Sequence, residues 1–129
     1  MRRAALLVLC LALTGCNGGT VDRHALANDS DSVDSLACEG RLLADGIADG
    51  DSTTRFARVH ARELEKRASN FEDALSERPT VPVIEREVRA LARKAGDVAQ
   101  LLGRLQQNPD EPDVARRLEP MLRKAGDCP

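Results

Sequence analysis

The chain has 129 residues, a formal net charge of −2, and only 2 % aromatic residues, which are two phenylalanines. It therefore lacks the aromatic platforms that stack on sugars or unpaired bases, and its slightly acidic balance provides no basic surface for nucleic acid. Composition thus argues against carbohydrate and nucleic acid partners, and the length is sufficient for one domain with a modest, alanine-padded core.

The first sixteen residues have the pattern of an export signal. Arg2 and Arg3 precede an apolar run over residues 4–13, which is too short to span a bilayer. The run closes on Leu13–Cys16, with the sequence Leu-Thr-Gly-Cys, and this resembles the lipobox of bacterial lipoprotein signal peptides. The resemblance implies cleavage before Cys16, attachment of diacylglycerol to its sulfur, and usually a further acyl chain such as palmitate on the new amino terminus.

Two other interpretations of this segment stay open, namely an ordinary cleaved signal peptide with a chance cysteine and a weakly amphipathic core helix. The lipoprotein interpretation divides the chain into a signal peptide at 1–15, a lipidated amino terminus and flexible linker at 16–32, and a helical domain at 33–129. Residues 17–31 mix Gly, Asn, Ser and Asp without sustained periodicity, as expected of a linker. The acyl chains would hold the protein on the outer face of the cell membrane, or on the periplasmic side where an outer membrane exists.

From residue 33 onward, apolar residues recur at helical spacing in four segments that glycine or proline separates. The four stripes are Val33, Leu36, Gly40, Leu43 and Ile47; Ala57, Ala61, Leu64, Ala68, Phe71 and Leu75; Ile84, Val88, Leu91, Ala95, Val98, Leu102 and Leu105; and Val114, Leu118, Met121 and Ala125. The middle two segments span about 24 residues and the outer two about 14. The sequence therefore predicts an all-α fold, an antiparallel four-helix bundle in which two short helices flank a long helical hairpin.

Cysteine usage predicts one disulfide. Cys10 leaves with the signal peptide and Cys16 carries lipid, so Cys38 and Cys128 are the remaining thiols. An exported chain with two remaining cysteines most simply joins them. In an up-down-up-down bundle, the start of the first helix and the end of the fourth lie at the same end, where these two cysteines would meet.

The chain lacks the sequence patterns of catalytic and metal sites. A carboxylate-bridged metal site in a helical bundle needs Glu-x-x-His on two helices, and His60-x-x-Glu63 occurs once, in the reverse order. No glycine-rich phosphate loop and no Gly-x-Ser-x-Gly turn is present. We therefore predict that the protein is not an enzyme and that it binds no metal or cofactor.

The region Val21–Glu77, about half of the chain, resembles small helical lipoproteins of high-GC Gram-positive bacteria, especially at Val21–Leu26 and from Ser35–Ala37 through Arg55–His60. The resemblance implies a single membrane with the domain outside the cell, and it brings no activity that could be transferred. It also draws attention to His60 and its neighbours.

Two functions remain compatible with the sequence. The first is a tethered bundle that presents a helical face to another envelope protein or to a second copy of itself. The alternative is a module that binds a small apolar or anionic ligand between helices near Arg55, Arg58 and His60. The first function predicts exposed apolar residues, whereas the second predicts a pocket lined by those polar groups. The predicted contact surface is the hairpin tip, which two short helices would leave uncovered, and its residues are Phe71, Leu75, Ile84 and Val88.

Overall fold

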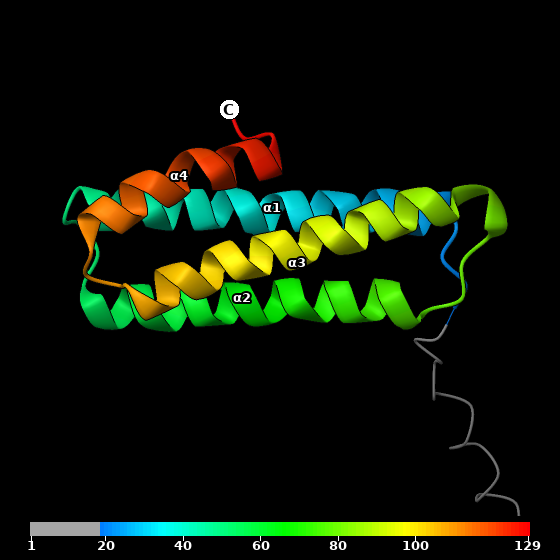
Figure 1. Ribbon diagram of the computed structural model, residues 1–129, viewed down its shortest axis with the longest axis horizontal. Helices are drawn as coiled ribbons and strands as arrows, with labels where there is room; N and C mark the ends of the chain where they lie inside the picture. Colours follow the sequence, from blue (N-terminus) through cyan, green and yellow to red (C-terminus); the bar gives the residue numbers. More distant parts are fainter. Residues whose placement is uncertain (1–18) are drawn as a thin grey trace, which may run out of the picture.

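A computed structural model describes residues 19–129, and these form an all-α four-helix bundle (Figure 1). The helices are α1 (Arg23–Ala48), α2 (Thr54–Glu77), α3 (Glu85–Gln107) and α4 (Pro112–Gly126), and a 3₁₀ turn at Pro82–Ile84 precedes α3. α2 packs mainly against α3, and α1 packs mainly against α4. The predicted signal peptide, including Cys16, lies outside the described residues.

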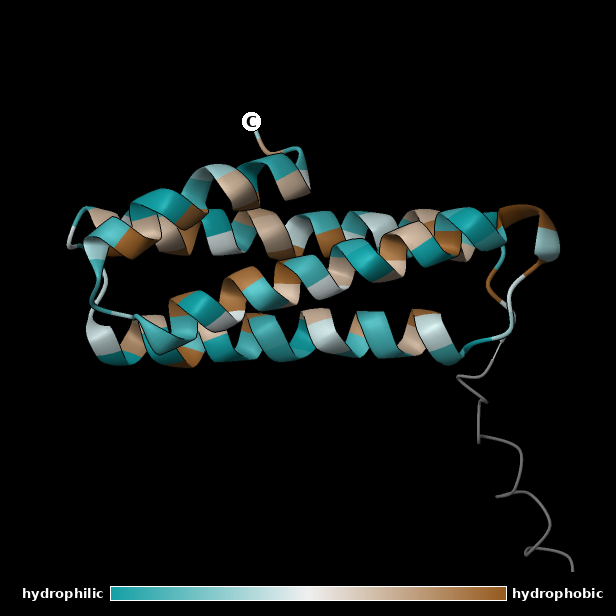
Figure 2. Cartoon of the chain, viewed as in Figure 1, coloured by the Kyte–Doolittle hydropathy of each residue, from teal (hydrophilic) through white to brown (hydrophobic). Residues whose placement is uncertain are grey.

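The core is built largely from leucine and alanine, and Figure 2 shows the hydrophobic residues on the inward faces of the helices. Every core residue predicted for the third segment is buried, and the stripe predicted for the second is buried except at Phe71, which is partly exposed. The fully buried alanines are Ala37, Ala44, Ala57, Ala61, Ala68, Ala95 and Ala115. Small side chains let the helices approach closely, which confirms the prediction of an alanine-padded core.

The first helix is longer than predicted, because α1 begins at Arg23 and not near residue 33. The predictions of a flexible linker through residue 32 and of a short first helix are therefore wrong. The Asp22 carboxylate accepts a hydrogen bond from the backbone N–H of Ala25 at 2.8 Å and caps the helix. Leu26, seven residues before Val33, continues the apolar stripe and packs against the core.

The inward face of α4 is also rotated from the prediction. Met121 is 48 % exposed, whereas Leu118 and Leu122 are fully buried. Gly126 explains the rotation, because a Cβ added there would lie 2.7 Å from both the carbonyl oxygen of Asp34 and the sulfur of Cys38. Only glycine allows this approach of α4 to α1, and the contact turns the Leu118–Leu122 face inward.

The apolar cluster predicted at the tip of the α2–α3 hairpin is covered. The four residues predicted to form an open surface there are Phe71, Leu75, Ile84 and Val88, of which Phe71 is half-buried and the others are buried. α1 extends to this end, and the segment before it pairs with the tip through two backbone hydrogen bonds. The N–H of Val21 donates to the Pro79 carbonyl at 2.8 Å, and the N–H of Val81 donates to the Val21 carbonyl at 3.2 Å. The prediction that Phe71, Leu75, Ile84 and Val88 are left open at the tip is therefore wrong, because the longer α1 and Val21 cover this cluster.

Candidate interaction surfaces

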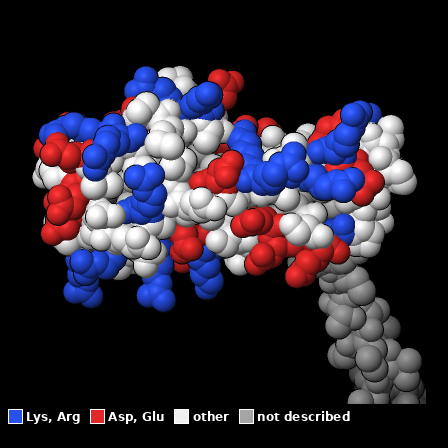
Figure 3. All heavy atoms as spheres, viewed as in Figure 1, with Lys and Arg blue, Asp and Glu red and all other residues white. Residues whose placement is uncertain are grey.

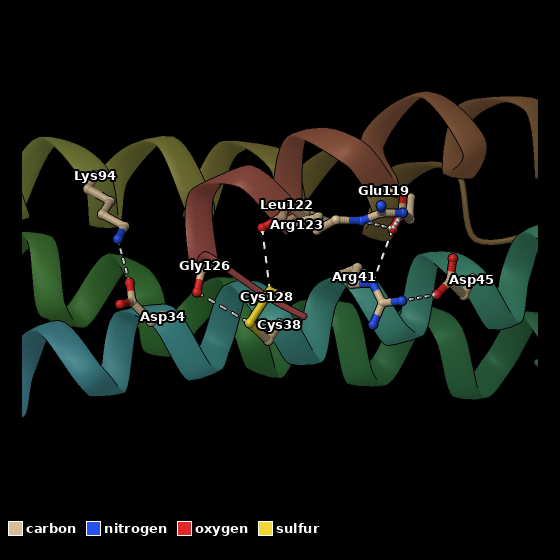
Figure 4. Close-up of a disulfide and its surroundings, with 10 residues drawn as sticks. All are labelled: Asp34, Cys38, Arg41, Asp45, Lys94, Glu119, Leu122, Arg123, Gly126 and Cys128. Atoms are coloured by element: carbon tan, nitrogen blue, oxygen red, sulfur yellow. Dashed lines mark hydrogen bonds and ion pairs between the residues drawn. A yellow bond between two sulfur atoms is a disulfide. The ribbon is translucent and has the colours of Figure 1, made fainter.

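A disulfide joins Cys38 to Cys128, with their Cα atoms 5.6 Å apart and a sequence separation of 90 (Figure 4). This confirms the predicted pairing, but the predicted geometry differs. Cys38 lies in the middle of α1 and not near its start, so the bond fastens the end of α4 to the middle of the longest helix.

A cluster of charged groups accompanies the disulfide along the α1–α4 contact (Figure 4). Arg123 donates two hydrogen bonds to Oε1 of Glu119, at 2.9 and 2.6 Å, and Arg41 of α1 donates a third at 3.1 Å. The hydrogen bond from Arg123 lowers the pKa of Glu119, burial opposes this, and the hydrogen bond from Arg41 lowers it further. The carboxylate is nearly buried and ionised, so this network is a structural link between α1 and α4.

The polar residues predicted to surround a ligand do not converge. His60 is half-buried, and its ring stacks on Phe56 with the centroids 5.4 Å apart. Arg55 and Arg58 are exposed on the outside of α2. None of these residues lines any of four well-formed grooves on the surface of residues 19–129, so nothing in their arrangement supports a ligand pocket around His60.

The largest of these grooves lies between α3 and α4 and has a volume of about 810 Å³. Its lining consists of Ala90, Arg93, Lys94, Asp97, Gln100, Leu101, Arg104, Met121, Lys124 and Ala125. Lys94 is already engaged, since it forms an ion pair with Asp34 of α1 (Figure 4). Met121 reaches this groove because α4 is rotated away from the predicted orientation.

The first half of α2 carries an exposed basic ridge, formed by Arg55, Arg58, Arg62 and Lys66. Basic side chains project from this edge of the molecule in Figure 3. Among residues 19–129, none of the four forms an ion pair with an acidic side chain. Their spacing also places like charges one turn apart, which destabilises an isolated helix by about 0.2–0.5 kcal/mol per pair.

Two large apolar side chains accompany the basic ridge. Val59, on the same stripe between Arg55 and Arg62, is 62 % exposed, and the neighbouring Phe56 is 56 % exposed. One of only two phenylalanines in the chain thus lies on the surface while alanine fills the core. Sequence reasoning identified Arg55 and Arg58 but missed the other members of this surface, although the recurrence of like charges at steps of three and four was a readable signal.

Neither metal ligation nor membrane crossing has a structural basis in residues 19–129. No group of three or more His, Cys, Asp or Glu side chains in this part of the chain is arranged to hold a metal ion. No helix within it is both long and apolar enough to cross a membrane. The chain matches no protein-family model, no curated protein and no solved structure.

Proposed function

We propose that this protein is a lipid-anchored extracytoplasmic interaction protein whose α2 basic ridge, with Phe56 and Val59, binds an acidic partner protein of the cell envelope. The observation that carries this proposal is the row of unpaired cations flanked by exposed apolar side chains on a single helix face. The Leu-Thr-Gly-Cys ending of the export signal supports the anchor on Cys16.

The disulfide supports a location outside the cytoplasm. Disulfides persist in oxidising compartments and are rare where thiols are kept reduced. The Cys38–Cys128 bond closes a loop that contains most of the bundle. Formation of this bond requires an oxidising environment. A reducing compartment would break the Cys38–Cys128 bond and with it the covalent link between α1 and α4.

The chemistry of the ridge supports an acidic partner. The like charges at Arg58, Arg62 and Lys66 form no ion pair within the described residues, so no direct ion pair offsets their mutual repulsion there. A partner that supplies carboxylates would relieve it, and burial of Phe56 and Val59 would add apolar contact area. Interfaces favour arginine and aromatic residues in such combinations.

Photo-crosslinking tests the interaction surface. The full chain, carrying a photoreactive phenylalanine derivative at position 56 and expressed in cells, should crosslink to an acidic protein of the cell envelope. Adding Arg62→Glu should reduce the yield about tenfold, as expected for a lost charge contact, and raised salt should weaken capture. The matched control is Arg117→Glu, because Arg117 is exposed on α4 and forms no ion pair within residues 19–129. Equal yields in the two variants, or crosslinks to lipid alone, would refute the proposed surface.

The anchor has its own test. Mass measurement of the amino-terminal peptide should show Cys16 at the terminus with an acyl modification. The Cys16→Ser variant should be released from membranes or remain unprocessed, and a variant that still matures and fractionates with membranes would contradict lipid anchoring.

A further inference from the structure

We propose that the tip of the α2–α3 hairpin, residues 78–84, is the end of the bundle that contacts the lipid bilayer, so that the helices stand away from the membrane. This inference rests on the proposed lipidation of Cys16. It assigns a surface, the tip, to a partner of defined chemistry, the headgroup and upper acyl region of a phospholipid bilayer.

The amino-terminal segment is fastened to the tip directly after the anchor site. Arg78 donates from Nε to the carbonyl of Gly19 at 3.4 Å, and the Val21 backbone exchanges hydrogen bonds with Pro79 and Val81. Only three peptide units separate Cys16 from Gly19, so their Cα atoms lie at most about 11 Å apart. A lipid on Cys16 therefore keeps Gly19 within about that distance of the membrane surface, and the contacts of Gly19 and Val21 place the tip at the same end of the bundle.

The tip also has the composition of a membrane-contacting surface. Residues 78–84 carry one charge, that of Arg78, and otherwise consist of proline, threonine, valine and isoleucine. Val83 is 68 % exposed, more than any other large hydrophobic side chain on the described surface. Figure 2 shows this connection as one of the strongly hydrophobic parts of the chain. A shallow groove of about 390 Å³ lies beside it, lined by Val81, Val83 and Ile84 on one side and by Asp22, Arg23 and His24 at the start of α1 on the other.

The opposite end of the bundle is unsuited to an anionic membrane. Its two connections, residues 49–53 and 108–111, contain Asp49, Asp51, Asp110 and Glu111 and no basic residue. α2 has 24 residues and is about 36 Å long, so a standing bundle holds the basic ridge about 18–35 Å from the tip, where a partner protein has access to it.

Tryptophan fluorescence tests this orientation cleanly because the chain contains no tryptophan. The lipidated full chain carrying Val83→Trp is reconstituted into phosphatidylglycerol and phosphatidylethanolamine vesicles, with and without acyl-chain-brominated phospholipid. We expect about twofold quenching by the brominated lipid, since an interfacial side chain reaches about 5–10 Å into the bilayer. The matched variant is Phe56→Trp, which places the same ring on the exposed surface near the far end of α2. It should show no quenching.

Each other outcome overturns the inference. Equal quenching in both variants means that the bundle lies flat, quenching of Phe56→Trp alone means that the opposite end faces the bilayer, and quenching of neither means that the tip stays in water. Mass measurement of the reconstituted chain separates the two proposals. An acylated Cys16 with an unquenched Val83→Trp variant leaves the anchor intact and refutes only the orientation, whereas an unmodified Cys16 refutes both.

Discussion

The carboxylate of Asp29 lies 3.5 Å from Nη1 of Arg78, and this ion pair joins the first turns of α1 to the end of α2. Arg78 also donates from Nε to the Gly19 carbonyl, so one guanidinium contacts both Gly19 and the helix α1 that follows it. Both side chains are largely buried, with exposed fractions of 27 % for Arg78 and 19 % for Asp29. This contact explains how a polar segment between Asn28 and Ser32 is kept helical against the tip.

Replacing Arg78 with glutamine should loosen the start of α1 without unfolding the domain. We expect faster amide hydrogen exchange over residues 23–32 and a loss of no more than about 1 kcal/mol in unfolding free energy, typical of a single ion pair near the surface. Arg86→Gln is the control, because Arg86 is exposed and unpaired among the described residues. If residues 23–32 of the parent protein exchange as fast as an unfolded peptide, the extended α1 is wrong.

Loss of the Cys38–Cys128 disulfide should lower the unfolding free energy more than any of the other substitutions predicted for this protein. The double variant Cys38→Ser/Cys128→Ser opens a loop of 90 residues, and the chain-entropy model assigns about 4–5 kcal/mol to such a crosslink. Denaturant titration of the soluble domain with and without reductant measures the effect. The parent with reductant and the double variant should unfold at the same denaturant concentration. A reductant-insensitive midpoint would show that the bond contributes nothing to stability.

Glu119 should make the domain sensitive to mild acid. Its pKa is lowered in the folded state, chiefly by Arg123, so the stabilisation is fully present above its ordinary value near 4.5. It is lost as pH falls further, through the lowered folded pKa. Glu119→Gln should remove about 1 kcal/mol at pH 7 and flatten the decline of unfolding free energy between pH 5 and 3. Glu63→Gln, at an exposed carboxylate without an ion pair in the described residues, is the control. Parallel curves for Glu119→Gln and the parent would contradict the role of the network.

The four-helix architecture was predictable because glycine and proline separate four apolar stripes, each with helical spacing. The length of α1 was not, because Asn28, Asp29 and Ser32 are polar and the segment resembles a linker when read alone. Their helical state depends on contacts distant in sequence, above all Asp29 with Arg78, and on the Asp22 cap. Met121 was misassigned for a related reason, since the rotation of α4 is set by the close approach of Gly126 to α1 and by the disulfide.

The basic ridge was also predictable only in part, because sequence spacing gives its charges but not their partners on other helices. Arg55 and Arg58 were identified within a local pattern, and the repetition of charge through Arg62 and Lys66 was available in the same way. Whether a cation has an acidic neighbour on another helix depends on packing. Glu39 of α1 reaches Arg67 at 4.0 Å and leaves the adjacent Lys66 unpaired, a difference that helical spacing alone does not predict.

The two phenylalanines provide the sharpest distinction between core and contact surface. Phe71 packs against the core, so Phe71→Glu should lower the unfolding free energy by about 2–4 kcal/mol, through lost packing and a poorly solvated carboxylate. Phe56 is 56 % exposed, so Phe56→Glu should change stability by less than about 0.5 kcal/mol. The same substitution at Phe56 should nevertheless weaken partner capture, because it introduces an acidic group beside the basic ridge and removes an apolar contact. Denaturant titration and crosslinking from position 59 measure the two effects separately. A stable Phe71→Glu variant that has lost partner capture would reverse the assignment and return the contact surface to the hairpin tip.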